Sequence, residues 1–114
     1  MSGLLELGSR DGASLSEVLD ALRDPTRRAI LLRLSESEQG CSSFGDLGSK
    51  TALSYHFAIL RKAGLTETRR AGVAKIISLR KAALEEAFPG LLEAVLKRTQ
   101  REAIGIGRSH RNGC

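Results

Sequence analysis

The sequence predicts a mainly α-helical domain of 114 residues that carries one small β-hairpin. Three observations support this fold class. The length is that of a single domain. Apolar residues recur at helical spacing in several separate segments, as Leu53, Phe57 and Leu60 do. Two short segments with Thr and Ile, 65–70 and 74–79, flank Gly72, which suits the turn of a hairpin.

Two helices are expected in the first third of the chain. Ser14 followed by Glu17 fits a capping box. The apolar residues after it have helical spacing: Leu15, Val18, Leu19 and Leu22. Asp24 caps the second helix, and Pro25 fits its first turn, where the missing N–H costs nothing. The polar stretch 35–43 then forms a loop.

A short helix and a longer one follow this loop. Phe44 and Leu47 lie three residues apart in a segment that two glycines keep short. Ser49 caps the next helix and Gly64 ends it. A short helix, a tight turn and a well-capped second helix make a helix-turn-helix. The hairpin behind it is then a wing.

The last third of the chain is predicted to be helical over residues 81–103. Its apolar positions are Leu84, Leu91, Leu92, Val95 and Leu96, and Pro89 with Gly90 should kink it or split it in two. We therefore expect a flexible N-terminal segment (1–13), one folded unit (14–103) and a disordered basic tail (104–114).

Positive charge is concentrated in the middle of the chain, whose formal net charge is +5. Residues 1–49 carry five basic and eight acidic side chains, whereas residues 50–80 carry seven basic side chains and one acid, Glu67. Such a segment favours an acidic partner. Because it coincides with a helix and a hairpin, we interpret it as a phosphate-binding surface.

Several classes of protein do not fit the sequence. No apolar run approaches the roughly 18 residues of a membrane span, and the N-terminus does not have the pattern of a signal peptide. Cys41 and Cys114 have no metal-binding spacing, so the reducing cytoplasm is the expected compartment. No catalytic grouping or phosphate-cradling loop is recognisable, so we expect neither an enzyme nor a cofactor.

Three segments, in their order and spacing, resemble the ArsR family of bacterial winged-helix repressors. They read "LRDPTRRAILLRL" (22–34), "KTALSYHFAILRKAGL" (50–65) and "TRRAGVAKIISL" (68–79). The resemblance covers roughly residues 15–80. It implies a winged helix-turn-helix that binds double-stranded DNA as a homodimer, with the first and last helices paired across a two-fold axis. The operator would then be an imperfect palindrome.

Ten residues are candidates for contact with DNA. Those placed to read base edges in the major groove are Lys50, Thr51, Ser54 and Tyr55. Those placed to bind phosphates are Arg61, Lys62, Arg69, Arg70 and Lys75. His56 would touch a phosphate or, as a structural residue, tie the helix to the domain. The alternatives are hydrogen bonding at the helix terminus for Thr51 and Ser54, and edge packing for Tyr55.

The input signal is not identified by the sequence. Many ArsR-family members bind metal through a Cys-x-Cys pair on the third helix, but here Ser43 and Gly45 occupy those positions. Others use histidines on the last helix, and residues 81–103 contain none. We therefore expect no metal site. Two alternatives stay open: a thiol-responsive repressor that uses Cys41, and a protein-interaction module whose basic face is incidental.

Overall fold

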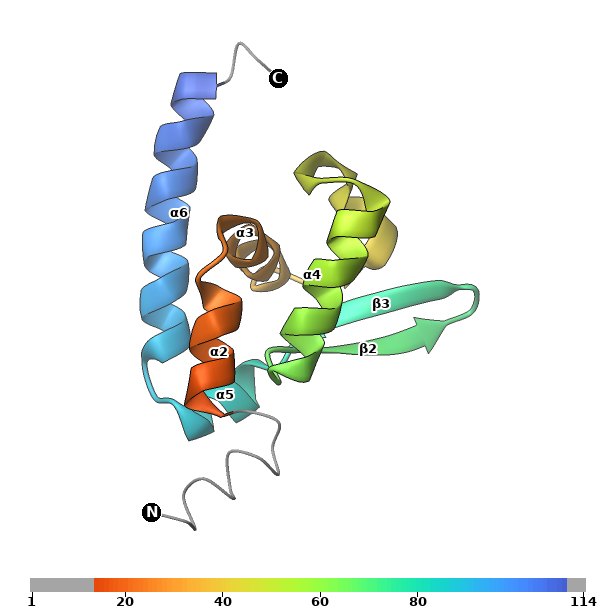
Figure 1. Cartoon of the computed structure of the whole chain (residues 1–114), viewed down its shortest axis with the longest axis horizontal. Coiled ribbons are helices and arrows are strands. Elements are labelled where there is room, and N and C mark those ends of the chain that lie inside the picture. Colours follow the sequence, from red (N-terminus) through yellow and green to blue (C-terminus); the bar gives the residue numbers. More distant parts are fainter. Residues whose placement is uncertain (1–13, 111–114) are drawn as a thin grey trace.

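The computed structural model describes residues 14–110, so the segments 1–13 and 111–114, predicted to be flexible or disordered, lie outside the described residues. The elements are α2 (Leu15–Leu22), α3 (Pro25–Leu34), β1 (Gln39–Gly40), the 3-10 helix η1 (Cys41–Leu47), α4 (Lys50–Lys62), β2 (Thr66–Ala71), β3 (Ala74–Leu79), α5 (Lys81–Ala87) and α6 (Leu91–His110) (Figure 1). This order is that of a winged helix-turn-helix, as predicted. Within the described residues, no helix is both long and apolar enough to cross a bilayer.

The predicted helix boundaries are confirmed by local hydrogen bonds. The side chains of Ser14, Asp24 and Ser49 each accept a hydrogen bond from the amide three residues on, at 3.2, 3.0 and 3.1 Å. Gly64 follows α4 with a φ of +84°, a backbone conformation that favours glycine. The break at Pro89 and Gly90 separates α5 from α6.

The structure differs from the sequence prediction in two elements. β1 lies in the segment predicted to be a loop and pairs with β3, so that the sheet order is β1-β3-β2. A two-residue strand is too short to show an alternating pattern. In addition, α6 runs to His110, although the tail was expected to begin at residue 104. Gly105 and Gly107 lower helix propensity, but they extend a helix that is already formed.

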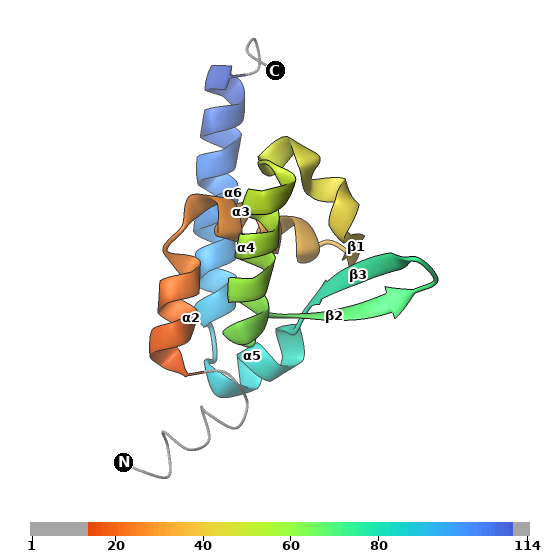
Figure 2. The same cartoon turned by 45° about the vertical axis from the view of Figure 1, so that its right-hand side comes forward.

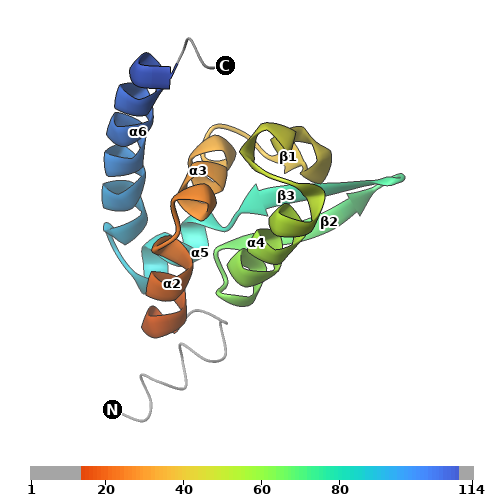
Figure 3. The same cartoon turned by 45° about the horizontal axis from the view of Figure 1, so that its top comes forward.

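The helical body and the wing lie on opposite sides of the molecule. In Figure 1, α2 lies beside the lower part of α6, and in Figures 1 and 3 the strands β2 and β3 run away from α6 on the other side of the molecule. Figure 2 shows α4 in front of α3, with the hairpin extending beyond it. α4 contacts both α3 and β2. The helix with the polar side is therefore held between the body and the wing.

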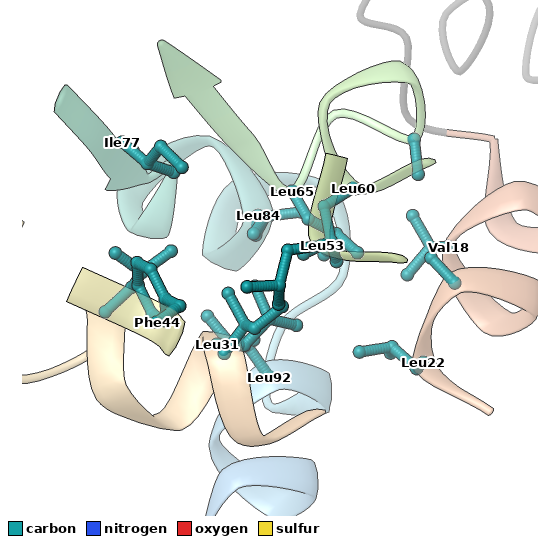
Figure 4. Packing of buried hydrophobic residues seen from close by; sticks show 14 residues of the cluster. Val18, Leu22, Leu31, Phe44, Leu53, Leu60, Leu65, Ile77, Leu84 and Leu92 are labelled. Atoms are coloured by element: carbon teal, nitrogen blue, oxygen red, sulfur yellow. The ribbon is translucent and has the colours of Figure 1, made fainter. Parts of the chain in front are cut away.

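A single apolar core joins these elements (Figure 4). Its buried residues are Val18, Ala21, Leu22, Ile30, Leu31, Leu34, Phe44, Leu53, Leu60, Ala63, Leu65, Ile77, Leu84 and Leu92. Phe44 of η1 packs edge-to-face on Phe57 of α4, with ring centroids 5.5 Å apart. Leu53 and Leu60 are buried and Phe57 is half-buried, which confirms the predicted core side of α4.

A buried arginine connects the helices α2, α3 and α4. The guanidinium of Arg27 donates from Nε to the carbonyl oxygen of Ala21 at 2.7 Å and from Nη2 to that of Asp20 at 3.2 Å. Its Nη1 lies 3.2 Å from Nδ1 of His56 in α4. Arg28 donates to the Leu22 carbonyl at 2.7 Å. The last carbonyls of α2 thus find partners on α3.

We predict that His56→Ala destabilises the fold by about 1–3 kcal/mol, because it leaves one donor of the buried Arg27 without an acceptor. Urea denaturation followed by circular dichroism measures this loss. The control is Ser54→Ala, an exposed change on the same helix that should alter stability by less than about 0.5 kcal/mol. Equal midpoints for the two variants would contradict the assignment.

Candidate nucleic-acid interface

The N-terminal half of α4 presents a polar side to solvent. Lys50, Thr51, Ser54 and Tyr55 are all exposed, and 65% of the Tyr55 surface is accessible. The Ala52 amide in the first turn of the helix already donates to the Ser49 hydroxyl. Within the described residues, neither the Thr51 nor the Ser54 hydroxyl has a hydrogen-bond partner. These side chains are therefore available to an external ligand.

His56 faces the domain as well as the solvent. The Arg27 guanidinium can only donate, so Nδ1 of His56 must accept, and in the neutral ring Nε2 carries the hydrogen. Burial alone would raise the pKa of the nearby Asp24 carboxyl. The hydrogen bond from the Arg27 amide and the positive charge of the Arg27 guanidinium outweigh burial and lower the pKa of Asp24. The contact with Arg27 matches the structural alternative for His56, and a phosphate contact stays a prediction.

The wing carries three of the predicted cations, and they differ in their surroundings. Arg69 forms an ion pair with Glu38, which lies just before β1. Arg70 lies opposite Lys75 in the β2–β3 ladder, and within the described residues neither has an ion-pair partner. The turn that follows contains Gly72, with a φ of +66°, and Val73, whose side chain is fully exposed.

A half-open groove of about 650 Å³ lies between α4, η1 and the wing. It brings together Lys50, Ser54 and Arg61 of α4 with Lys75 of β3. The remaining candidates do not line it: Thr51, Tyr55, His56, Lys62, Arg69 and Arg70. The fold thus gathers four of the ten predicted residues in one concave surface.

Sequence reasoning missed several residues of this surface. Cys41, Ser42, Gly45 and Gly48 from η1 and the following turn line the groove, as does Thr68 of β2. The Glu38 partner of Arg69 was also missed. No periodicity marks these positions, because they meet only through the pairing of β1 with β3 and the packing of η1 on α4.

The segment that the resemblance compares with a metal-binding helix makes contacts within the chain here. The Ser43 hydroxyl donates to the Gly40 carbonyl oxygen at 2.8 Å. Asp46 pairs with Arg33 at 2.8 Å, and this hydrogen bond lowers the pKa of the Asp46 carboxyl. Among the described residues, no three of the His, Cys, Asp and Glu side chains come together as a possible metal site.

Comparisons with known proteins agree with this fold. Residues 22–69 match a family model described as a helix-turn-helix domain. The chain is 39% identical over 84 residues to YceK of Bacillus subtilis, an uncharacterized HTH-type transcriptional regulator, covering 70% of this chain and 84% of YceK.

Solved structures give the same family. The crystal structure of the ArsR family transcriptional regulator RHA00566 has a TM-score of 0.57 and 28% identity, covering 76% of this chain and 87% of that one. Rv0081 of M. tuberculosis has a TM-score of 0.56 and 28% identity, and the match covers 84% of this chain and 90% of Rv0081. Reduced HlyU from Vibrio cholerae has a TM-score of 0.55 and 25% identity, and the match covers 73% of this chain and 94% of HlyU. With the winged helix and its exposed polar helix, these matches show that the chain belongs to the ArsR family of winged helix-turn-helix proteins and is a DNA-binding transcriptional regulator.

Proposed function

We propose that the protein is a repressor that binds an imperfect palindromic operator as a homodimer. The observation that carries the proposal is the exposed polar side of α4, flanked by basic residues of the helix end and the wing. A helix of this kind can enter the major groove while the wing lies along the flanking backbone. The chain then blocks transcription by occupying promoter DNA.

The polar side of α4 supplies the base contacts in this proposal. Lys50 can donate to guanine, and the hydroxyls of Thr51 and Ser54 can serve several bases. Tyr55 is exposed one helical turn after Thr51. All four lie in the N-terminal half of the helix, which is the part that reaches base edges in helix-turn-helix complexes.

The phosphate contacts come from two places. Arg61 and Lys62 end α4, and both are exposed. Arg70 and Lys75 extend from the wing, whereas Arg69 must first leave Glu38. Nε2 of His56 can add a neutral donor. Each neutralised phosphate releases counterions, so binding should weaken as salt rises.

The homodimer is supported by apolar surface on α2. Leu15 and Leu19 lie one turn apart and are 51% and 49% exposed. Their helix α2 lies next to α6 (Figure 1), where Val95 and Leu96 are half-buried. By contrast Leu92, one of the apolar positions predicted for the last helix, is 6% exposed and packs within its own chain. Pairing of α2 and α6 with a second copy would cover this surface and set two α4 helices on one face of DNA.

The proposal is tested by fluorescence anisotropy with a duplex from upstream of the protein's own gene and a shuffled duplex. We expect tighter binding to the first and a steep loss of affinity with salt for both. Expression of a reporter gene placed behind the upstream DNA should decrease when the protein is supplied. Weak binding that does not respond to salt would overturn DNA recognition, and an unchanged or rising reporter would overturn repression.

For α4 we predict that Lys50→Ala weakens binding to the operator by about 1–3 kcal/mol and binding to shuffled DNA by less, because a base contact is lost. Ser54→Ala should also weaken operator binding more than binding to shuffled DNA, with a smaller loss of binding free energy than Lys50→Ala. Anisotropy titrations on both duplexes measure the difference. Equal losses on the two duplexes would show that these side chains do not read bases.

For the wing we predict that Arg70→Ala weakens binding to every sequence and lowers the salt slope by about one. Arg69→Ala should cost less, because Glu38 holds that guanidinium. Glu38→Gln should tighten binding to all DNA by releasing Arg69. Glu36→Gln is the control, since Glu36 is exposed on the same loop and, in the described part of the chain, has no ion pair. An unchanged slope for Arg70→Ala would remove the wing from the interface.

For the dimer we predict that Leu19→Glu gives folded monomers with weak operator binding, because it places a charge in the proposed interface. Ser16→Glu adds the same charge at another exposed position of α2 and should leave the dimer intact. Sedimentation at micromolar concentration measures both. A wild-type chain that sediments as a monomer and binds one chain per site would contradict the dimer and the palindrome together.

A further inference from the structure

The groove between α4, η1 and the wing has an apolar floor under a basic rim. Leu53 and Phe57 of α4, Ile77 of β3 and the half-buried Cys41 of η1 contribute the apolar part. The lining is more apolar than polar. A volume of about 650 Å³ lies within the range of sites that hold small organic ligands.

The rim consists of three cations from two elements. Lys50 begins α4, Arg61 lies in its last turn, and Lys75 comes from β3 on the opposite wall. In the part of the chain that the structure describes, none of the three has an ion-pair partner. Charge complementarity therefore selects an anion.

A DNA strand would use only half of this surface. A phosphodiester backbone matches the cations but offers little to Leu53, Phe57 and Ile77. A small organic acid with an aromatic or aliphatic body matches both, since its body can bury against the floor while its acid group binds the rim.

We propose that the groove is a binding site for a small apolar organic acid whose occupancy excludes DNA. Lys50, Ser54 and Arg61 belong to the proposed DNA-reading helix, and Lys75 to the wing, so ligand and DNA compete for the same groups. This inference rests on the proposed function only for the competition. The binding of the acid is a property of the groove itself.

Anilinonaphthalene sulfonate is a suitable probe, because it is an aromatic anion that fluoresces when its ring system is buried. Phenyl naphthylamine is its uncharged counterpart. Both are titrated into the full chain without DNA at fixed salt. We expect the sulfonate to bind and its counterpart to bind several-fold more weakly. Arg61→Gln and Lys75→Gln should each weaken the sulfonate about tenfold, the loss expected for one charged hydrogen bond.

Two matched controls separate the groove from the general basic surface. Lys62→Gln removes a neighbouring charge of α4, and Arg70→Gln removes the cross-strand neighbour of Lys75, yet neither residue lines the groove. Both should bind the probe like the wild type. Gly45→Leu adds bulk to the groove wall at a position where a Cβ meets no atom within 4 Å, so it should lower probe binding without disturbing the fold.

Competition is then measured with labelled operator. The apparent affinity for DNA should fall in proportion to free sulfonate, and Gly45→Leu should resist this effect. Absence of probe binding, or equal weakening by Lys62→Gln and Arg61→Gln, overturns the site. Saturation with probe that leaves DNA binding unchanged overturns the exclusion. A chain that binds the probe with the expected variant pattern but never binds DNA supports the site and overturns the proposed function instead.

Discussion

The buried guanidinium of Arg27 is the interaction on which the rest of the architecture depends. It lies on α3, takes up two carbonyls at the end of α2 and reaches His56 on α4. A charged group with 4% exposure is costly unless its donors are satisfied. Those partners exist only when all three helices are in place. The arginine therefore penalises any packing in which α4 has shifted.

The orientation of α4 follows from two constraints. Leu53 and Leu60 hold one side in the core, and the Arg27–His56 contact holds the helix from a second direction. A helix fixed on one side only could roll about its axis. Here a rotation of α4 about its axis would expose Leu53 and Leu60 or leave a buried Arg27 donor without an acceptor. The polar side with Lys50 and Ser54 is therefore held in a defined orientation relative to the domain.

Local features could be predicted from the sequence, whereas features made by distant segments could not. The caps at Ser14, Asp24 and Ser49 and the hairpin were predicted because their signals lie within a few residues. β1, the Glu38–Arg69 pair and the burial of Arg27 depend on partners about thirty residues away or on strand pairing. The groove belongs to this second class, because three elements build it. In the sequence Arg27 is one more basic residue, and only tertiary packing distinguishes it from the solvated ones.

The position of β2 at the edge of the sheet has a consequence for solubility. The order β1-β3-β2 leaves one side of β2 unpaired along residues 66–71, and such an edge can template pairing with another chain. Charged side chains on an edge strand oppose that pairing, and β2 carries Glu67, Arg69 and Arg70. The wing arginines thus keep separate molecules apart in solution. If both arginines were replaced by alanine, β2 would consist of threonine and alanine apart from Glu67, and its unpaired edge could pair more readily with another molecule.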